Sequence, residues 1–493
     1  MLTQDVYGDS RLSLWLRVRE FAVPAPMIET ATTRRRAGDW AGACAAARID
    51  LDLDLRRLAR THGRDLAARI RADLRHLAPD LLRWHLPRIA PDGLLRPGLT
   101  LTLARYEGAG YDGSCPVHLV VRTPPAWADA GQRFSLALYD RSRPEPGEAR
   151  HPHPRPDRRF RLDLHRHLWD ARRSDELRIR AGAGVPAAGG GAVAPRRLPE
   201  PPELPELPEL PELPELPGTV PDGHRFAVDR WAAEAGILLR AEGRTAGAVT
   251  VRLGTRRHLL LDLAPDGDGS GPPALRITAV SGDPAASGSG DRDARVLPVL
   301  PDAATRVAPD LELLRAGLIE AGRLHPLVAS ALEPGYRPAG PRRDPDPPGG
   351  PRLVECRGAR HRIGPVGGVL TALDHGPDEI RREELLVALG GTPLPCLRAI
   401  DEAHRRPDCL TGVRERLDHG DTAGALAVVE GLLGPDAVLR GGALRDELRA
   451  AARRRLVYGL FRAGLAGPGP GRVPDGRGSP RGHRPRPRPA TAR

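Results

Sequence analysis

The feature that most constrains this chain is a low-complexity segment, residues 199–217, in which Pro-Glu-Leu recurs with a strict period of three. A period of three matches the three residues per turn of the polyproline II helix, so each residue type would line its own face. At about 3.1 Å per residue, the segment would extend over roughly 50 Å. We therefore predict an acidic, extended spacer that divides the sequence into two halves.

The composition is typical of a very G+C-rich genome, which weakens any inference from runs of Ala, Gly, Pro or Arg. A length of 493 residues gives room for two to four domains, each with its own core. The 56 glycines and 53 prolines predict that much of the chain is turn, linker or disorder. Neither lysine nor asparagine is present, so all 75 basic side chains are arginine. Schiff-base chemistry on a lysine is thereby excluded.

The net charge of +12 is concentrated at the C-terminal end. Residues 467–493 contain seven arginines and one aspartate, half of the total, so the rest of the chain is only mildly basic. The five cysteines are odd in number and form no C-x-x-C pair, which favours a reducing cytoplasm over a disulfide framework. No stretch approaches about 18 apolar residues, so we predict neither export nor membrane insertion.

Helical and strand-like periodicities alternate along the chain and predict an α+β protein. It would have an N-terminal helical bundle, a β-rich antiparallel middle interrupted by the proline-rich spacer, and a mainly helical C-terminal domain. Met27 directly precedes the first clear helical signals, so we expect a leader before it that is not part of the native fold. The predicted regions are a leader at 1–33, a helical region at 34–90, a β-rich region at 99–180, the Pro-Glu-Leu spacer at 181–222, a β-rich region ending in helices at 223–333, a linker at 334–351, the C-terminal domain at 352–465 and a disordered Arg/Pro/Gly tail at 466–493.

Apolar spacing underlies these regions. Leu66, Ile70 and Leu74 recur at helical spacing and predict one buried helix face. The alternation of Leu51, Leu53 and Leu55 fits a strand inside this helical region, and periodicity alone does not decide it. Strands are predicted at 99–103, 118–122, 134–138, 160–167 and 176–180, and beyond the spacer at 236–240, 248–253, 258–264 and 274–280.

Familiar catalytic motifs are absent or lack their context. Residues 401–404 spell the DEAH box of helicases, but that box works with a phosphate-binding loop whose lysine this chain does not have. The glycine-rich stretches do not meet the G-x-G-x-x-G spacing. Neither a G-x-S-x-G elbow nor an H-E-x-x-H pair occurs. We therefore assign no catalytic or cofactor-binding residue from the sequence.

Residues of the types that bind zinc gather in the last third of the chain. They are Cys356, His361, Asp374, His375, Cys396, His404 and Cys409. Their spacing is unlike that of any zinc finger or ribbon, so we predict no metal site and no cofactor. Asp374 and His375 are interpreted as a helix N-cap, or alternatively as a general acid/base pair. A second histidine group, His151, His153, His165 and His167, is interpreted as a solvated Arg/His surface.

An internal match joins the two ends of the chain. Residues 38–45 and 420–427 agree at six of eight positions, and both begin with Gly-Asp. Glycine would end one helix, aspartate would cap the next, and the small residues would let the two helices pack closely. The segment resembles the inter-helix turn of tetratricopeptide-like hairpins, but the 34-residue repeat is absent. We interpret the match as shared hairpin chemistry rather than as a true repeat.

Three blocks, residues 35–47, 76–88 and 374–391, resemble a group of uncharacterised actinobacterial hypothetical proteins. The resemblance covers the helical start and the last third of the chain. It implies a source organism of high G+C content, and it implies no activity and no catalytic residue.

Three functions remain open. The first is a cytoplasmic, non-enzymatic interaction or scaffold protein with protein partners, which the spacers and helical hairpins favour. The second is nucleic-acid binding through the basic tail and Arg357, Arg360 and Arg362. The third is an enzyme of unrecognised type whose site in the C-terminal domain includes Asp374, His375 or Cys356.

Overall fold

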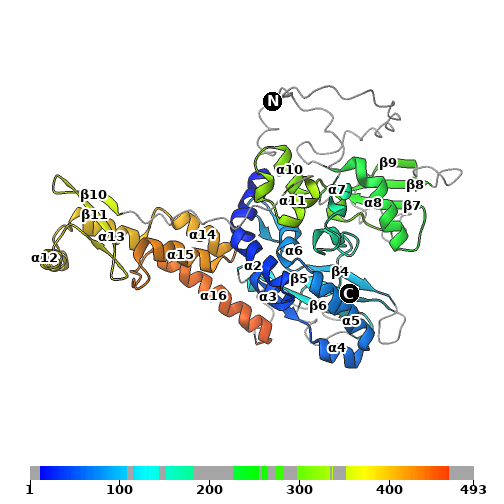
Figure 1. Ribbon diagram of the computed structural model, residues 1–493, viewed down its shortest axis with the longest axis horizontal. Helices are drawn as coiled ribbons and strands as arrows, with labels where there is room; N and C mark the ends of the chain where they lie inside the picture. The colour runs from blue at the N-terminus through cyan, green and yellow to red at the C-terminus, as the bar shows by residue number, and fades with distance from the viewer. Residues whose placement is uncertain are drawn as a thin grey trace, which may run out of the picture.

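The computed structural model describes residues 11–107, 115–129, 131–143, 151–181, 226–254, 258–264, 274–280, 297–333, 336 and 351–465. Helices and sheets are both abundant, which confirms the α+β class. The described residues up to 333 form a body, and residues 351–465 form an arm that projects from it (Figure 1). The predicted spacer at 181–222, apart from its first residue, and the tail at 466–493 lie outside the described residues, as does nearly all of the linker at 334–351.

A four-stranded sheet lies at the centre of the body. Its order is β1-β6-β5-β4, where the strands are β1 (Ile49–Asp52), β4 (Thr100–Tyr106), β5 (Val117–Arg122) and β6 (Phe134–Asp140). β5 pairs antiparallel with β4 on one side and with β6 on the other. β1 pairs with β6 in parallel, with Ile49 opposite Phe134. Most residues of β4, β5 and β6 are buried, because helices and loops cover the sheet. The predicted antiparallel middle therefore holds except at this one parallel edge.

Helices surround the central sheet. α5 buries Leu66, Ile70 and Leu74 on one face, which confirms the helix that their spacing predicts. A short two-stranded ladder, β2 with β3, follows α6. These elements of the body are η1 (Val18–Ala22), α2 (Ala25–Arg36), α3 (Trp40–Ala46), α4 (Leu55–Thr61), α5 (Arg64–His76), α6 (Pro79–His85), β2 (Arg88–Ile89), β3 (Leu94–Leu95), η2 (Ala126–Ala128), η4 (Arg166–Leu168), α7 (Glu176–Arg180), α9 (Asp302–Thr305), α10 (Pro309–Arg315), η5 (Ala321–Arg323) and α11 (Pro326–Leu332).

The start of the described chain belongs to this core. Leu14, Val18 and Met27 are buried among the residues of the helices and the sheet. The prediction of a leader at 1–33 is therefore corrected for residues 11–33, whose apolar side chains complete the packing. Two arginines of this stretch contact the body: Arg17 donates a hydrogen bond to Asp92, and the guanidinium of Arg19 lies over the ring of Trp84.

A second sheet forms a separate layer of the body. Its strands, β7 (Gly247–Arg252), β8 (His258–Ala264) and β9 (Ala274–Val280), are antiparallel and match the predicted ones. The strand predicted at 236–240 is wrong, because these residues complete α8 (Val228–Ala241), which packs on the sheet through Trp231, Ala235 and Leu238. The strands predicted at 160–167 and 176–180 are also wrong, since the first stretch forms turns leading into η4 and the second forms α7.

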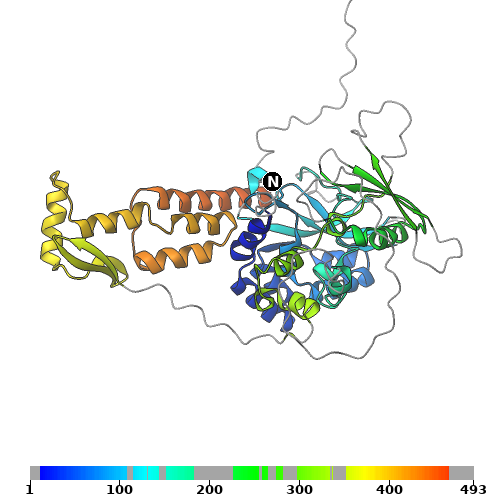
Figure 2. The same ribbon diagram turned by 90° about the horizontal axis from the view of Figure 1, so that it is seen from above.

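The arm has its own core. A three-stranded antiparallel sheet and the helix α12 form its tip, and four further helices lie between the tip and the body (Figure 2). The elements are β10 (Arg352–Cys356), β11 (Ala359–Val366), β12 (Val369–Ala372), α12 (Pro377–Ala388), α13 (Pro395–Arg405), α14 (Leu410–Asp418), α15 (Thr422–Leu433) and α16 (Ala443–Ala463). None of the helices described is long and apolar enough to cross a membrane.

The two matching segments form the same turn in two different places. Gly38 links α2 to α3 and Gly420 links α14 to α15, each with φ of 80°. Asp39 accepts a hydrogen bond from the backbone of Gly42 at 2.8 Å, and Asp421 accepts one from Gly424 at 3.2 Å. The predicted hairpin chemistry is thus confirmed at both sites.

The second of these turns is where the arm meets the body. Arg48 donates to the carbonyl oxygen of His419 at 2.9 Å and to Asp421 Oδ1 at 3.1 Å. Farther along, the hydroxyl of Tyr458 donates to Asp50 Oδ2, and α16 thereby contacts strand β1. Polar contacts to the edge strand β1 therefore fix the position of the arm.

Candidate metal centre in the arm

Three side chains of metal-binding type meet at the tip of the arm. The Sγ atoms of Cys356 and Cys396 and a ring nitrogen of His375 all lie within 4.8 Å of one another. Cys356 ends β10, His375 lies in the turn between β12 and α12, and Cys396 is the second residue of α13. The centre therefore joins three elements that are separated by 18 and 20 residues in the sequence.

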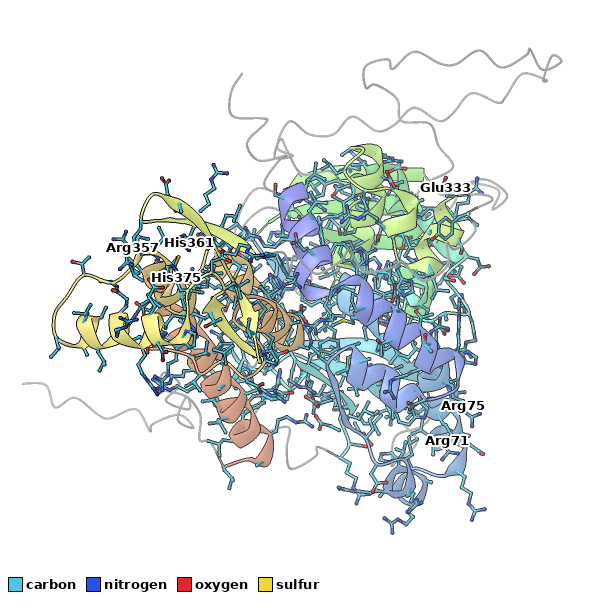
Figure 3. The ribbon with its side chains drawn as sticks, turned by 60° about the vertical axis from the view of Figure 1, so that its left-hand side comes forward. Arg71, Arg75, Glu333, Arg357, His361 and His375 are labelled. Atoms are coloured by element: carbon cyan, nitrogen blue, oxygen red, sulfur yellow. The ribbon has the colours of Figure 1, made fainter. Side chains whose placement is uncertain are left out.

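The register of the small sheet places a fourth residue beside these three. Val354 of β10 lies directly opposite His361 of β11, so both point to one face, and Cys356 two residues later shares that face. The ring of His361 stacks on that of His375, with 4.4 Å between centroids and an interplanar angle of 10° (Figure 3). His361 thus contacts one of the three ligand candidates directly.

His375 is held in a defined orientation. Its Nδ1 lies 3.2 Å from Glu379 Oε2, on the first turn of α12, and this hydrogen bond lowers the pKa of Glu379. Its Nε2 is buried and has no hydrogen-bond partner among the described residues, while its side chain is only 4% exposed. A carboxylate on one ring nitrogen and a free second nitrogen is the usual arrangement of a metal-binding histidine.

The two cysteines are buried completely and are not in a disulfide. Burial, with the neighbouring Cys356, raises the pKa of the Cys396 thiol to about 11. A thiol that remains protonated is a poor nucleophile, so Cys396 does not have the properties of a catalytic cysteine. Two thiols and an imidazole are, however, the donor set that zinc prefers, and zinc binding would displace the thiol protons.

The other predicted ligand residues lie outside this cluster. Asp374 accepts hydrogen bonds from the backbone and the guanidinium of Arg362, which lower its pKa to about 2. The predicted N-cap is not found, because Gly376 occupies that position of α12 and no side chain caps it. His404 is buried on α13, and Cys409 precedes α14; neither belongs to the group of three.

Two of the three arginines proposed to bind nucleic acid are in ion pairs. Arg357 lies 3.0 Å from Glu379 and 2.7 Å from Glu383, and Arg362 lies 2.7 Å from Asp374. The charge that these arginines would offer to phosphate is thus partly compensated within the tip of the arm. Arg360 is exposed on β11.

The second histidine group is not a solvated surface. His151, His165 and His167 are all buried, and only His153 is exposed. His165 Nε2 lies 3.2 Å from Glu234 Oε2, which also accepts hydrogen bonds from Arg180. These histidines therefore belong to an internal polar network of the body, which local sequence density did not reveal.

No family model, curated protein or solved structure matches this chain. Function has to be inferred from the geometry described above.

Proposed function

We propose that this protein is a cytoplasmic, non-enzymatic interaction protein whose arm contains a structural zinc site. The observation that carries the zinc site is the convergence of Cys356, His375 and Cys396 within 4.8 Å. The sequence had favoured no metal site, on the ground of spacing alone. Spacing is a weak guide here, because the ligands come from a strand, a turn and a helix rather than from one local motif.

Burial supports a structural role for the ion. A catalytic zinc keeps one coordination position open to substrate, whereas a structural zinc is closed by four protein ligands. Both cysteines are inaccessible and His375 nearly so, which fits the closed type. His361 lies beside the group of three, and its buried Nδ1 has no partner among the described residues; because its ring stacks parallel to that of His375, it would have to turn to become the fourth ligand.

The position of the site indicates what the ion would stabilise. α12 has no buried residue, so apolar packing contributes little to its position. Polar contacts attach its N-terminal half instead. Glu379 contacts His375, and Glu379 and Glu383 form ion pairs with Arg357. An ion bound to His375 would link the first turn of α12 to β10 and α13 and so order the tip.

The surface of α12 supports the interaction role. Leu385, Leu386 and Leu389 are 60%, 51% and 86% exposed, and they form an apolar group at the far end of the arm. Groups of exposed large apolar residues mark sites of protein–protein contact. The partner that fits is a protein with an apolar groove that accepts a helix. Cys44, Cys356, Cys396 and Cys409 form no disulfide, which is consistent with the reducing compartment proposed.

Metal analysis of the purified full-length protein tests the zinc site. We expect about one zinc per chain in the wild type and a loss of most of it in C356S/C396S. C409S is the matched control, since Cys409 lies in the arm but outside the cluster, and it should retain zinc. If His361 is the fourth ligand, H361A should weaken zinc affinity on the order of tenfold or more. Zinc well below one equivalent in the wild type, or equal zinc in C356S/C396S, would contradict the proposal.

A further inference from the structure

The body contains a cavity of about 560 Å³, which is lined by residues between Arg11 and Pro309. Its wall combines Trp15 from the start of the described chain, His85 at the end of α6, Arg88 of β2, and residues 301–303 and 306–309 on either side of α9. A volume of this size is within the range of cavities that bind small molecules. None of these wall residues belongs to the cysteine and histidine cluster of the arm.

Three buried nitrogen atoms in this wall have no hydrogen-bond partner among the described residues. They are Trp15 Nε1, His85 Nε2 and Arg88 Nε. The nearest carboxylate to His85 is Asp310, whose Oδ2 is 3.9 Å away, and burial lowers the pKa of His85 to about 4, so its ring is neutral. Trp15 Nε1 and Arg88 Nε always carry a hydrogen, whereas one nitrogen of a neutral imidazole accepts. Buried donors in folded proteins are nearly always paired, so these two on one cavity indicate a missing acceptor.

The charges around the cavity favour an anion. Arg88 donates to the backbone carbonyls of Gly93 and Arg83 and to no carboxylate. Arg96, which is exposed, makes no ion pair within the part of the chain that the structure describes. Asp302 is the single acidic residue among those lining the cavity, and burial raises its pKa. Both the charge and the unpaired donors are therefore complementary to an anionic acceptor.

Four further arginines line the wall, and three of them are in ion pairs: Arg11 with Glu312, Arg159 with Asp157 and Arg161 with Asp163; the fourth is Arg306. Much of the remaining wall is apolar and includes Leu14, Leu86, Leu101, Phe160, Leu162 and Leu168. An inorganic anion would leave this surface without contacts, and a neutral apolar molecule would leave the donors of Trp15 and Arg88 unpaired. We propose that the body binds a small amphipathic anion in this cavity, with its acidic head at Trp15, Arg88 and Arg96 and its apolar part against the leucines.

Binding of the fluorescent sulfonate 1-anilinonaphthalene-8-sulfonate to the full-length protein tests this site. We expect saturable binding that dodecanoate displaces, and that neither dodecanol nor inorganic phosphate displaces at the same concentration. R96Q and W15F should each lower the affinity for the probe by roughly fivefold to tenfold, because each removes one hydrogen-bond donor to the anion. R71Q is the matched control, since Arg71 is exposed on α5 and lies outside the cavity wall (Figure 3).

R96Q replaces an exposed side chain, so its folding is not in question, and circular dichroism of W15F checks the other variant. If dodecanol displaced the probe as strongly as dodecanoate, the requirement for an acidic head group would be contradicted. If phosphate displaced the probe, the requirement for an apolar part of the ligand would be contradicted. Equal probe affinity in wild type, R96Q and W15F would overturn the site itself and leave water as the acceptor for the donors of Trp15 and Arg88. None of these outcomes depends on zinc, so the result is independent of the proposed function.

Discussion

At the scale of single residues, the body buries ionised groups and pairs them closely. Glu234 on α8 accepts hydrogen bonds from Arg180 at 2.6 Å through both of its oxygens, and His165 lies 3.2 Å away. Burial alone would raise the pKa of this carboxyl. The hydrogen bonds and charges of His165 and Arg180 outweigh burial and lower the pKa to about 2. Glu234 therefore stays ionised and joins α7 to α8.

This lowered pKa predicts a pH-dependent stability. Because the folded pKa is about 2 and an unperturbed glutamate has a pKa near 4.5, the unfolded state binds more protons between these values. The stabilisation by Glu234 is complete above about pH 4.5 and is lost as the pH falls toward 2. It amounts to on the order of 3 kcal/mol. E234Q should lower the free energy of unfolding at pH 7, and its difference from the wild type should shrink between pH 4.5 and 3.

Urea unfolding at several pH values measures this difference. The control is E333Q, because Glu333 is exposed and makes no ion pair within the described residues (Figure 3). A constant difference between E234Q and the wild type from pH 7 to pH 3 would contradict the assignment. His165 also shows why this network was not predicted from the sequence. The density of arginine and histidine around it suggested a surface, whereas its partner Glu234 is 69 residues away on another helix.

At the scale of elements, apolar periodicity predicted where an element lies better than whether it is a helix or a strand. The leucines of α5 and the strands β7, β8 and β9 lie where their spacing placed them. Residues 236–240 were predicted as a strand because a short apolar run fits a strand and a helix equally well. Residues 236–240 are helical because the preceding Trp231 and Ala235 lie at helical spacing on the same buried face of α8. The metal centre was missed for a related reason, because its ligands come from β10, the turn before α12, and α13.

The exposed leucines of α12 give a prediction at the same scale. L385E/L389E should leave the free energy of unfolding within about 0.5 kcal/mol of the wild type, because neither side chain is packed. It should abolish binding of the protein partner, because the apolar face would then carry charge. Parallel affinity purifications and denaturant unfolding measure the two effects.

V438E is the matched control for this surface, because Val438 is 86% exposed but lies before α16 rather than on α12. A partner that is retained by wild type and V438E and lost from L385E/L389E supports the role of α12. Partners that are unchanged in L385E/L389E would contradict it. Sedimentation velocity distinguishes a different protein from a second copy of the chain, since only a second copy would make the wild type dimeric on its own.

At the scale of the whole molecule, the two matching Gly-Asp turns have different surroundings. The turn at Gly38 is open, and a Cβ atom there would have no neighbour within 4 Å. The turn at Gly420 is pressed against the body, where a Cβ atom would lie 1.8 Å from the carbonyl oxygen of Gly131. Sequence could predict the turn at both sites, but not this contact, because the backbone of Gly131 approaches from a part of the chain almost 290 residues away.

This difference allows the attachment of the arm to be tested with two substitutions of the same kind. Both glycines have φ of 80°, so alanine costs roughly 1 kcal/mol of backbone strain at either position. G420A should cost roughly 1–3 kcal/mol more, because its methyl group overlaps the Gly131 carbonyl and forces the backbones apart. That separation would also break the bonds from Arg48 to His419 and Asp421. Small-angle scattering should therefore show a larger radius of gyration for G420A and an unchanged one for G38A, and equal scattering of the two variants would show that the Gly131 contact does not hold the arm.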